Sequence, residues 1–215
     1  MKLYGAALSP FAARCLLAIR WKGLDIPLVP PPGGGLKSPE YLAINPYGKV
    51  PALDADGGIV IESEVIVEFL EDRFPETPLL PADPLARAHS RAISRAIDLY
   101  VMAPMTTLFG QLNPATRDRA LVDVKLAEMR RGLDGLEMLV RAPYAAGESR
   151  SLADCALVPL VFYIEGLMPA FGQTAMLASY PKVAAVAAKT KEDPIVQQLM
   201  QEMAASLEAF RQRRG

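Results

Sequence analysis

The feature that most constrains this chain is a change of pattern near residue 84. Before it, short runs typical of strands alternate with helical segments, and after it the sequence is helical with short breaks. The proline-rich stretch 74–81 cannot continue a helix and indicates a linker. We therefore expect a domain at 1–76, a linker at 77–83 and an all-α domain at 84–215.

The order of elements predicts the fold of the first domain. We expect the following elements in order: strand 2–4, helix 10–22, strand 26–29, a short helix near 39–43, strands 52–54 and 59–61, and helix 63–73. The two helix-linked strands should be parallel, and the turn at Gly57 and Gly58 predicts an antiparallel hairpin. The fold class is therefore an α/β thioredoxin-like N-terminal domain followed by an all-α C-terminal helical domain.

The second domain should contain five helices, at 84–112, 115–141, 152–169, 181–191 and 194–213. Pro104 and Pro159 fall inside two of them. Since each proline removes a backbone donor, we expect it to kink or split its helix.

Composition excludes several classes of protein. The chain has 215 residues, 51% hydrophobic and 22% charged, with a net charge of -1, which is typical of a globular protein without a polyanionic partner. The start of the chain lacks the pattern of a secretory signal, and the apolar runs at 16–19 and 155–164 are too short for a membrane helix. We expect a soluble, cytoplasmic protein that binds neither nucleic acid nor membrane.

The metal-ligating residue types are sparse. Cys15 and Cys155 lie far apart in sequence, without a C-x-x-C pair, and His89 is the single histidine. This spacing favours a reducing compartment and gives no zinc pattern, so we expect no metal.

Three short motifs carry chemical possibilities. Ser9-Pro10 is a helix-start signal, and the same helix end would favour an anion such as a thiolate. Pro51 belongs at a strand start, where a cis bond would turn the backbone of Val50 outward to a peptide-like ligand, although a trans turn is the commoner state. Glu62-Ser63 begins a helix whose amides could receive a carboxylate while Glu62 takes an amine, or it is a simple cap.

Together the motifs occur in the order and spacing of the glutathione transferase family, and the resemblance covers nearly the whole chain. The run Ser9-Pro10-Phe11 with Arg14 resembles the Ser-Pro-Phe-x-x-Arg start of the tau class and, with cysteine in place of serine, of the omega class. The run 37–40, Asn45-Pro46, Val50-Pro51 and Glu62-Ser63 are similar to that group's glutathione-binding elements. Gly147 with 151–154 is similar to the family's helix-capping box, a folding element.

The resemblance implies a role for each matching position. Ser9 would donate its hydroxyl hydrogen to the glutathione sulfur and hold it as thiolate, with Phe11 beside it. Val50, next to Pro51, would pair with the central peptide, Glu62 and Ser63 would hold the γ-glutamyl group, and Lys37 or Lys49 the glycyl carboxylate. Glutathione is then a co-substrate, and no further cofactor is implied.

The resemblance also implies an apolar site for a small hydrophobic electrophile between the domains. The candidates on the first helix of the second domain are Tyr100, Met102, Met105 and Phe109, although such residues at helical spacing are more often core. The implied activity is conjugation of the glutathione thiolate to the electrophile, a detoxification reaction, by a homodimer.

Two alternatives stay open. The first is a zeta-like cis–trans isomerase, although zeta-like sequences usually have a Ser-Ser-Cys-Ser run that 9–12 does not match. The second is a glutathione-binding or regulatory protein that keeps the fold without catalysis, because fold does not guarantee activity.

Overall fold

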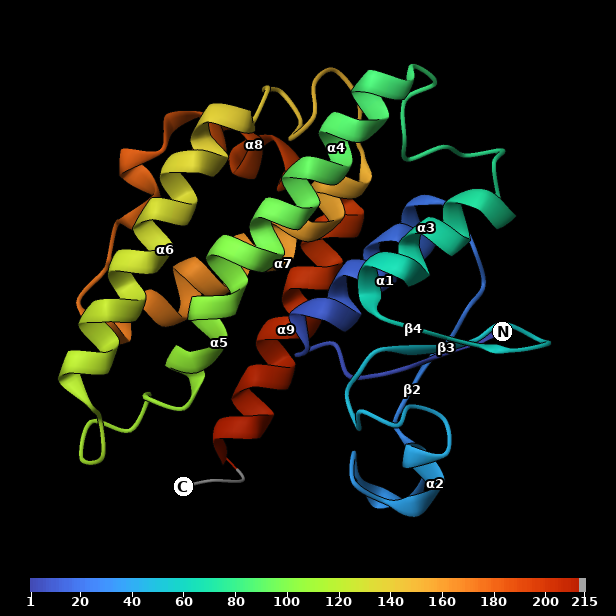
Figure 1. The fold of residues 1–215 in the computed structure, drawn as a ribbon, viewed down its shortest axis with the longest axis horizontal. Coiled ribbons are helices and arrows are strands. Elements are labelled where there is room, and N and C mark those ends of the chain that lie inside the picture. The colour runs from blue at the N-terminus through green and yellow to red at the C-terminus, as the bar shows by residue number, and fades with distance from the viewer. Residues whose placement is uncertain (213–215) are drawn as a thin grey trace. The chain divides into compact units, whose positions relative to one another are not determined.

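A computed structural model describes residues 1–212, and these form two compact units. The first contains Met1–Leu79 together with the segment from Glu192 onward, and the second is Leu80–Lys191. The sequence analysis assigns 192–215 to the second domain, whereas in the structure 192–212 pack with the first unit, and 213–215 lie outside the described residues. Figure 1 shows the elements of both units.

The first unit is built around a four-stranded mixed sheet with the order β2-β1-β3-β4. Its elements are β1 (Lys2–Tyr4), α1 (Pro10–Trp21), β2 (Leu28–Val29), a 3-10 turn (Pro32–Gly34), α2 (Pro39–Leu42), β3 (Ala52–Asp54), β4 (Ile59–Ile61), α3 (Ser63–Arg73) and α9 (Pro194–Gln212). β1 pairs parallel with β2 and antiparallel with β3, and β3 and β4 form an antiparallel hairpin. Both predicted strand orientations are confirmed.

The two faces of this sheet carry different helices because side chains alternate along each strand. On one face Tyr4 and Ala52 pack with Tyr41 of α2, and the two tyrosine rings meet edge to face at 6.2 Å. α1 and α3 pack against each other and against the strands, and α9 packs on α1. Figure 1 shows α2 on the side of the sheet away from α1 and α3.

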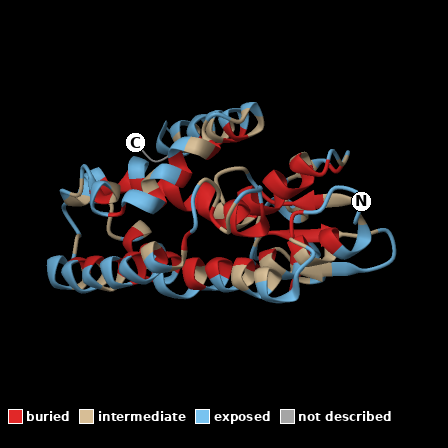
Figure 2. Ribbon diagram, turned by 90° about the horizontal axis from the view of Figure 1, so that it is seen from above, coloured by how far each residue is buried: buried red, intermediate tan, exposed pale blue. Residues whose placement is uncertain are grey.

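The second unit is built of helices, joined by turns and by a segment with two isolated β-bridges. The helices and turns are α4 (Pro84–Ala96), a π-helical segment (Ile97–Met102), α5 (Ala103–Phe109), α6 (Arg119–Leu139), α7 (Leu152–Leu167), 3-10 turns at Met168–Phe171 and Met176–Ser179, and α8 (Pro181–Thr190). The helices in Figure 2 carry a buried side and an exposed side, as expected where each contributes one stripe to a core.

Three helix predictions differ from the structure. The helix expected at 84–112 contains the π-helical segment, and Pro104 lies in the first turn of α5, where a missing N–H is tolerated. α7 continues through Pro159 without a break, so this proline does not split the helix. The start expected at 115 falls at Arg119 instead, because the Asp118 carboxylate accepts from the N–H of Leu121 and caps α6 there.

α7 is the most apolar helix of the second unit. The stretch Leu152–Phe171 is long and apolar enough to cross a membrane by length and composition alone, which the sequence analysis did not expect. However, 78% of its most apolar window is buried within the protein, as in the core helix of a globular protein.

The π-helical segment and α6 approach each other closely at Gly132. A side chain there would meet the carbonyl oxygen of Tyr100, since a Cβ atom would lie 2.2 Å from it. Only glycine therefore allows this contact between the two elements.

Candidate functional site

The strand register brings the three predicted motifs to one end of the sheet. Tyr4, the last residue of β1, pairs with Ala52, the first residue of β3, and Ala52 also pairs with Ile61, the last residue of β4. The segment that leads to Ser9, the residues before β3 and the start of α3 therefore all lie at this end. The motifs are far apart in sequence, and the pairing of the strands brings them to the same end of the sheet.

Ser9 occupies the N-cap of α1, as predicted. Its Oγ accepts a hydrogen bond of 3.3 Å from the N–H of Ala12, and Pro10 follows at the first helical position. The side chain is half-buried, and its hydroxyl donates to no group among residues 1–212. The Ser9 hydroxyl can thus cap the helix as an acceptor and still donate its hydrogen to a ligand, so the two interpretations of this serine are compatible.

The peptide bond between Val50 and Pro51 is cis. The carbonyl of the preceding residue, Lys49, accepts from the Tyr41 hydroxyl at 2.7 Å and from the Asn45 side chain at 2.8 Å. Neither the N–H nor the C=O of half-buried Val50 has a hydrogen-bond partner in the described chain. The hydrogen bonds to the Lys49 carbonyl thus fix this turn, while the N–H and C=O of Val50 can pair with a ligand.

α3 begins at Ser63, as predicted. Ser63 is the first helical residue, and the N-cap is Glu62 with φ of 69°, a left-handed conformation that is rare outside glycine. The first amides of a helix lack partners within it, so this turn offers donors and a positive dipole end to a carboxylate. Glu62 is exposed, and Ser63 is buried.

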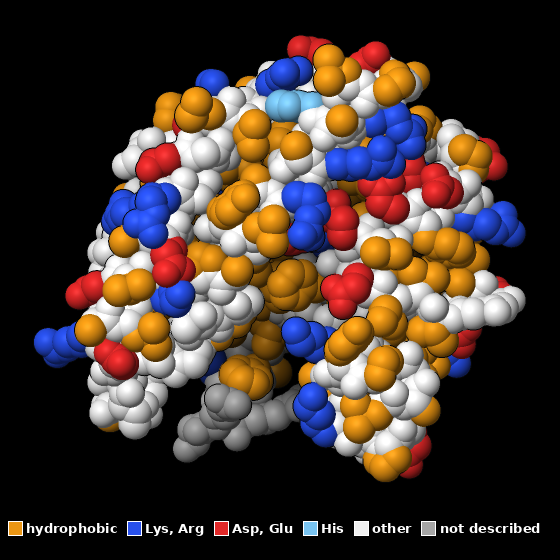
Figure 3. Space-filling model, viewed as in Figure 1, with side chains coloured by type: hydrophobic (Ala, Val, Ile, Leu, Met, Phe, Trp, Pro, Cys, Tyr) orange, Lys and Arg blue, Asp and Glu red, His pale blue; other side chains and the backbone are white. Residues whose placement is uncertain are grey.

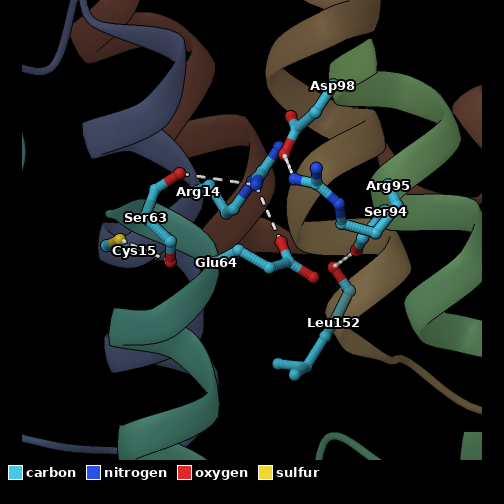
Figure 4. A network of polar contacts seen from close by, with 8 residues as sticks. All are labelled: Arg14, Cys15, Ser63, Glu64, Ser94, Arg95, Asp98 and Leu152. Atoms are coloured by element: carbon cyan, nitrogen blue, oxygen red, sulfur yellow. Dashed lines mark hydrogen bonds and ion pairs between the residues drawn. The ribbon is translucent and has the colours of Figure 1, made fainter. Parts of the chain in front are cut away.

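The first turn of α3 is held by two residues of α1 that Figure 4 shows as sticks. Arg14 is 2% exposed, and its Nη1 donates to Glu64 Oε2 at 2.8 Å and to Ser63 Oγ at 3.4 Å. The thiol of Cys15 donates to the Ser63 carbonyl at 3.5 Å, and burial raises the pKa of this thiol. Sequence reasoning noted Arg14 only as part of a motif and missed its partner Glu64.

The predicted lysines lie in the exposed loops before β3. Lys37 Nζ donates to the Tyr47 carbonyl at 3.3 Å, and the Lys49 side chain is exposed. Phe11, in the first turn of α1, is half-buried, with the Arg14 guanidinium 6.0 Å from the centre of its ring.

The predicted electrophile residues separate into two groups. Met102 and Met105 are buried, at 2% and 0% exposure. Phe109 is half-buried, with its ring 5.1 Å from that of Tyr163. Tyr100 is 60% exposed and lines a cavity of about 320 Å³ within the second unit. Their contact with a substrate stays a prediction.

The arrangement in the first unit can hold a small peptide-like anion. It offers a serine hydroxyl at one helix start, the free backbone of Val50 and the amides of a second helix start. Within residues 1–212, no group of three or more His, Cys, Asp or Glu side chains could hold a metal ion.

Comparisons with known proteins identify the family to which this chain belongs. Residues 3–78 match the family model of the glutathione S-transferase N-terminal domain, and residues 96–206 match that of its C-terminal domain. A glutathione S-transferase of Pseudomonas putida is 31% identical, over 98% of this chain and 96% of the relative. A maleylacetoacetate isomerase of Pseudomonas aeruginosa is 33% identical, over 92% of this chain and 94% of the relative.

A solved structure with the same fold is that of a maleyl pyruvate isomerase, described as a bacterial glutathione S-transferase of the zeta class, in holo form. It is 28% identical, with a TM-score of 0.76, over 93% of this chain and 96% of that one. The chain therefore belongs to the glutathione S-transferase family, whose members are enzymes that use glutathione. The predicted fold class is confirmed, and the finer likeness to the tau and omega classes stays a prediction.

Proposed function

We propose that this protein catalyses the glutathione-dependent cis–trans isomerisation of a small maleyl-type acid. The observation that carries the proposal is the full-length similarity to a maleylacetoacetate isomerase, supported by the zeta-class isomerase of the same fold. The sequence analysis held this reaction as the alternative to conjugation, and the relatives favour it.

The reaction uses the glutathione thiolate as a nucleophile that is later released. Its sulfur forms a bond to one carbon of the cis double bond, and the π electrons move to the adjacent carbonyl as an enolate. The former double bond is now single and rotates. The enolate then returns its electrons, the C–S bond breaks, and the trans product and the thiolate leave, so glutathione is not consumed.

The protein's task in this reaction is to hold the thiolate and place it. A thiol with a pKa of about 8.5 is mostly protonated at neutral pH, and the thiolate is the nucleophile. A hydrogen bond from the Ser9 hydroxyl and the positive end of α1 both favour the thiolate. Val50 would bind the central peptide, Glu62 and Ser63 the γ-glutamyl group, and Lys37 or Lys49 the glycyl carboxylate.

Conjugation to an apolar electrophile is the second candidate. Ser9-Pro10-Phe11-Ala12 departs from the run that zeta-like sequences usually have, and the relative with the greatest coverage given above is named only as a transferase. In conjugation the C–S bond persists and one glutathione is used for each product.

The stoichiometry of glutathione separates these reactions. We expect a maleyl acid to isomerise over many turnovers while the free thiol concentration stays constant. A chlorodinitrobenzene assay on the same preparation measures conjugation, in which thiol loss equals product. Conjugation without isomerisation would contradict the proposal in favour of the second candidate. Retention on immobilised glutathione with neither reaction would favour a binding protein.

We also infer that the protein acts in the cytoplasm as a homodimer, as the resemblance implies. Several large apolar side chains of the second unit are exposed, among them Leu85, Leu99, Tyr100 and Met138. On the surface over α4 and α6, hydrophobic side chains are exposed among charged ones (Figure 3). Sedimentation equilibrium should give twice the mass of one chain, and a monomer at micromolar concentration would contradict this inference.

A further inference from the structure

Two helices of the first unit begin at the proposed glutathione site. α1 begins with Ser9, beside the proposed sulfur position, and α3 begins with Ser63, at the proposed γ-glutamyl position. A ligand that binds both helix starts requires them to be held at a fixed separation.

Arg14 is the charged residue of α1 that reaches the start of α3. Its Nη1 lies 2.8 Å from Glu64 Oε2 and 3.4 Å from Ser63 Oγ, and the side chain is 2% exposed (Figure 4). Glu64 is 18% exposed. A buried guanidinium must be paired, so this ion pair keeps the first turn of α3 at one place on α1.

The contact lies one helical turn from Ser9's end of α1. Arg14 follows Pro10, the first helical residue, by four positions, so both lie on the same face of the helix. The neighbouring Cys15 adds a second link through its thiol to the Ser63 carbonyl at 3.5 Å. Two successive residues of α1 thus hold Ser63 by its hydroxyl and by its carbonyl.

We propose that Arg14 is a positioning residue, which through Glu64 and Ser63 sets the separation between the two helix starts that bind glutathione. The inference rests on the proposed glutathione site. Because the opposite charges of Arg14 and Glu64 largely offset each other, we expect the pair to act on the bound sulfur mainly through the placement of α3. Displacement of a binding group by about 1 Å can lower a rate about 100-fold, so a small movement of α3 matters.

The most informative variant is Glu64→Gln, which keeps the shape of the side chain and removes its charge. It is matched by Glu202→Gln, which removes the charge of the α9 carboxylate whose two oxygens accept from Nη2 of Arg20, also on α1, at 2.7 Å and 2.9 Å. Arg14→Lys is the second test, because one ammonium does not reproduce the planar fork of a guanidinium.

Two quantities are measured on each protein at a temperature well below its unfolding midpoint. Calorimetry gives the Kd of glutathione, and thiolate absorbance against pH gives the pKa of the bound thiol. We expect Glu64→Gln and Arg14→Lys to raise the Kd about tenfold and to raise the thiol pKa as well, because both ends of the ligand lose their alignment. Glu202→Gln should change neither quantity.

A purely structural role would lower the unfolding midpoint and leave both quantities unchanged. That result, in a wild type that binds glutathione, would overturn the inference and leave the proposed function intact. A wild type that does not bind glutathione would overturn the proposed function, and the inference with it. Because Glu64 is less buried than Arg14, its variant gives a folded protein to measure even where a change at Arg14 does not.

Discussion

Ser9 combines a structural and a proposed chemical task in one hydroxyl group. Its oxygen accepts from the N–H of Ala12, and its hydrogen is available to a sulfur. We expect Ser9→Ala to lower kcat/KM at neutral pH by about 10- to 100-fold, the effect of a rise of one to two units in the thiol pKa. The activity should recover partly at high pH, where the thiol ionises without help.

The capping task of Ser9 can be separated by a control. Loss of an N-cap costs about 1 kcal/mol of stability. Asp118 caps α6 in the same way, through a 3.0 Å bond from the N–H of Leu121. Asp118→Ala should therefore lower stability by a similar amount and leave kcat/KM unchanged. Equal losses of kcat/KM in the two variants would show that Ser9 acts only as a cap.

Lys22 and Glu71 form the most buried ion pair of the first unit. Their charged atoms are 2.7 Å apart with side chains 0% and 5% exposed, and Lys22 also donates to the carbonyls of Phe74 and Thr77. We expect Lys22→Met to lower the free energy of unfolding by about 3–5 kcal/mol, because the buried Glu71 carboxylate loses the cation that pairs with it. Urea unfolding measures the change.

An exposed pair provides the comparison for Lys22. Lys191 and Glu165 are 2.6 Å apart, but their side chains are 37% and 48% exposed. Lys191→Met should cost less than about 1 kcal/mol. If the two methionine variants lose the same stability, burial does not determine the strength of these pairs.

The buried ion pairs also show what the sequence could not predict at this scale. Ser9 was recognisable as a cap because serine, proline and the following apolar run are adjacent. Arg14 and Glu64 are 50 residues apart, and nothing local distinguishes Glu64 from the exposed acids of its helix. Such pairs follow from the packing of α1 on α3, which only the structure provides.

At the scale of elements, local signals predicted most of the first unit. β1, β3, β4 and α3 have the predicted bounds, because the turn from Ala55 to Gly58 and the helix-start signals are local. α7 is not split at Pro159, because the tertiary packing of this buried helix outweighs the intrinsic cost of a proline. The positive φ of Glu62, the N-cap of α3, was not predicted, because no sequence signal indicates it.

The capping box that begins α7 gives a prediction of pH dependence. The carboxylate of Asp154 accepts from the N–H groups of Ala145 and Ser151 and from the Ser151 hydroxyl. Burial, the largest influence, nevertheless raises the pKa of Asp154 from 3.8 to about 6. The folded protein thus binds this proton more tightly than the unfolded chain does. The protonated Asp154 therefore contributes its full stabilisation of the fold below pH 3.8, and this stabilisation is lost as the pH rises to about 6.

Asp154→Asn removes this titration. From pH 4 to pH 6.5 the free energy of unfolding of the wild type should fall by about 2 kcal/mol relative to that of the variant. Urea unfolding at several pH values measures it. A difference that is independent of pH, or one that grows as the pH rises, would mean that the hydrogen bonds outweigh the burial of the carboxylate.

At the scale of the whole molecule, the first unit is discontinuous in sequence. α9 follows the second unit in the chain but packs on α1, where Arg20 pairs with Glu202 and the indole N–H of Trp21 donates to Asp193 at 3.0 Å. The predicted boundary kept 192–215 with the second domain because the sequence there is simply one more amphipathic helix. The local sequence of an amphipathic helix does not indicate which part of the protein its apolar face packs against.

The discontinuity predicts that the glutathione site depends on the end of the chain. α9 buries Val196, Leu199 and Met203, and each buried side chain of this size contributes about 1.5–3 kcal/mol. A chain ending at Lys191 should therefore lose several kcal/mol of stability. Because α1 carries Ser9, the truncated chain should also bind glutathione more weakly.

Trp21 is the single tryptophan of the chain and reports directly on this packing. It is 6% exposed beside Asp193, so truncation should shift its fluorescence emission to longer wavelength. Glu202→Gln, which removes one partly exposed ion pair and leaves α9 in place, should keep the emission of the wild type and lose at most about 1 kcal/mol. Wild-type emission and undiminished glutathione binding in the truncated chain would mean that the first 79 residues form a complete unit by themselves.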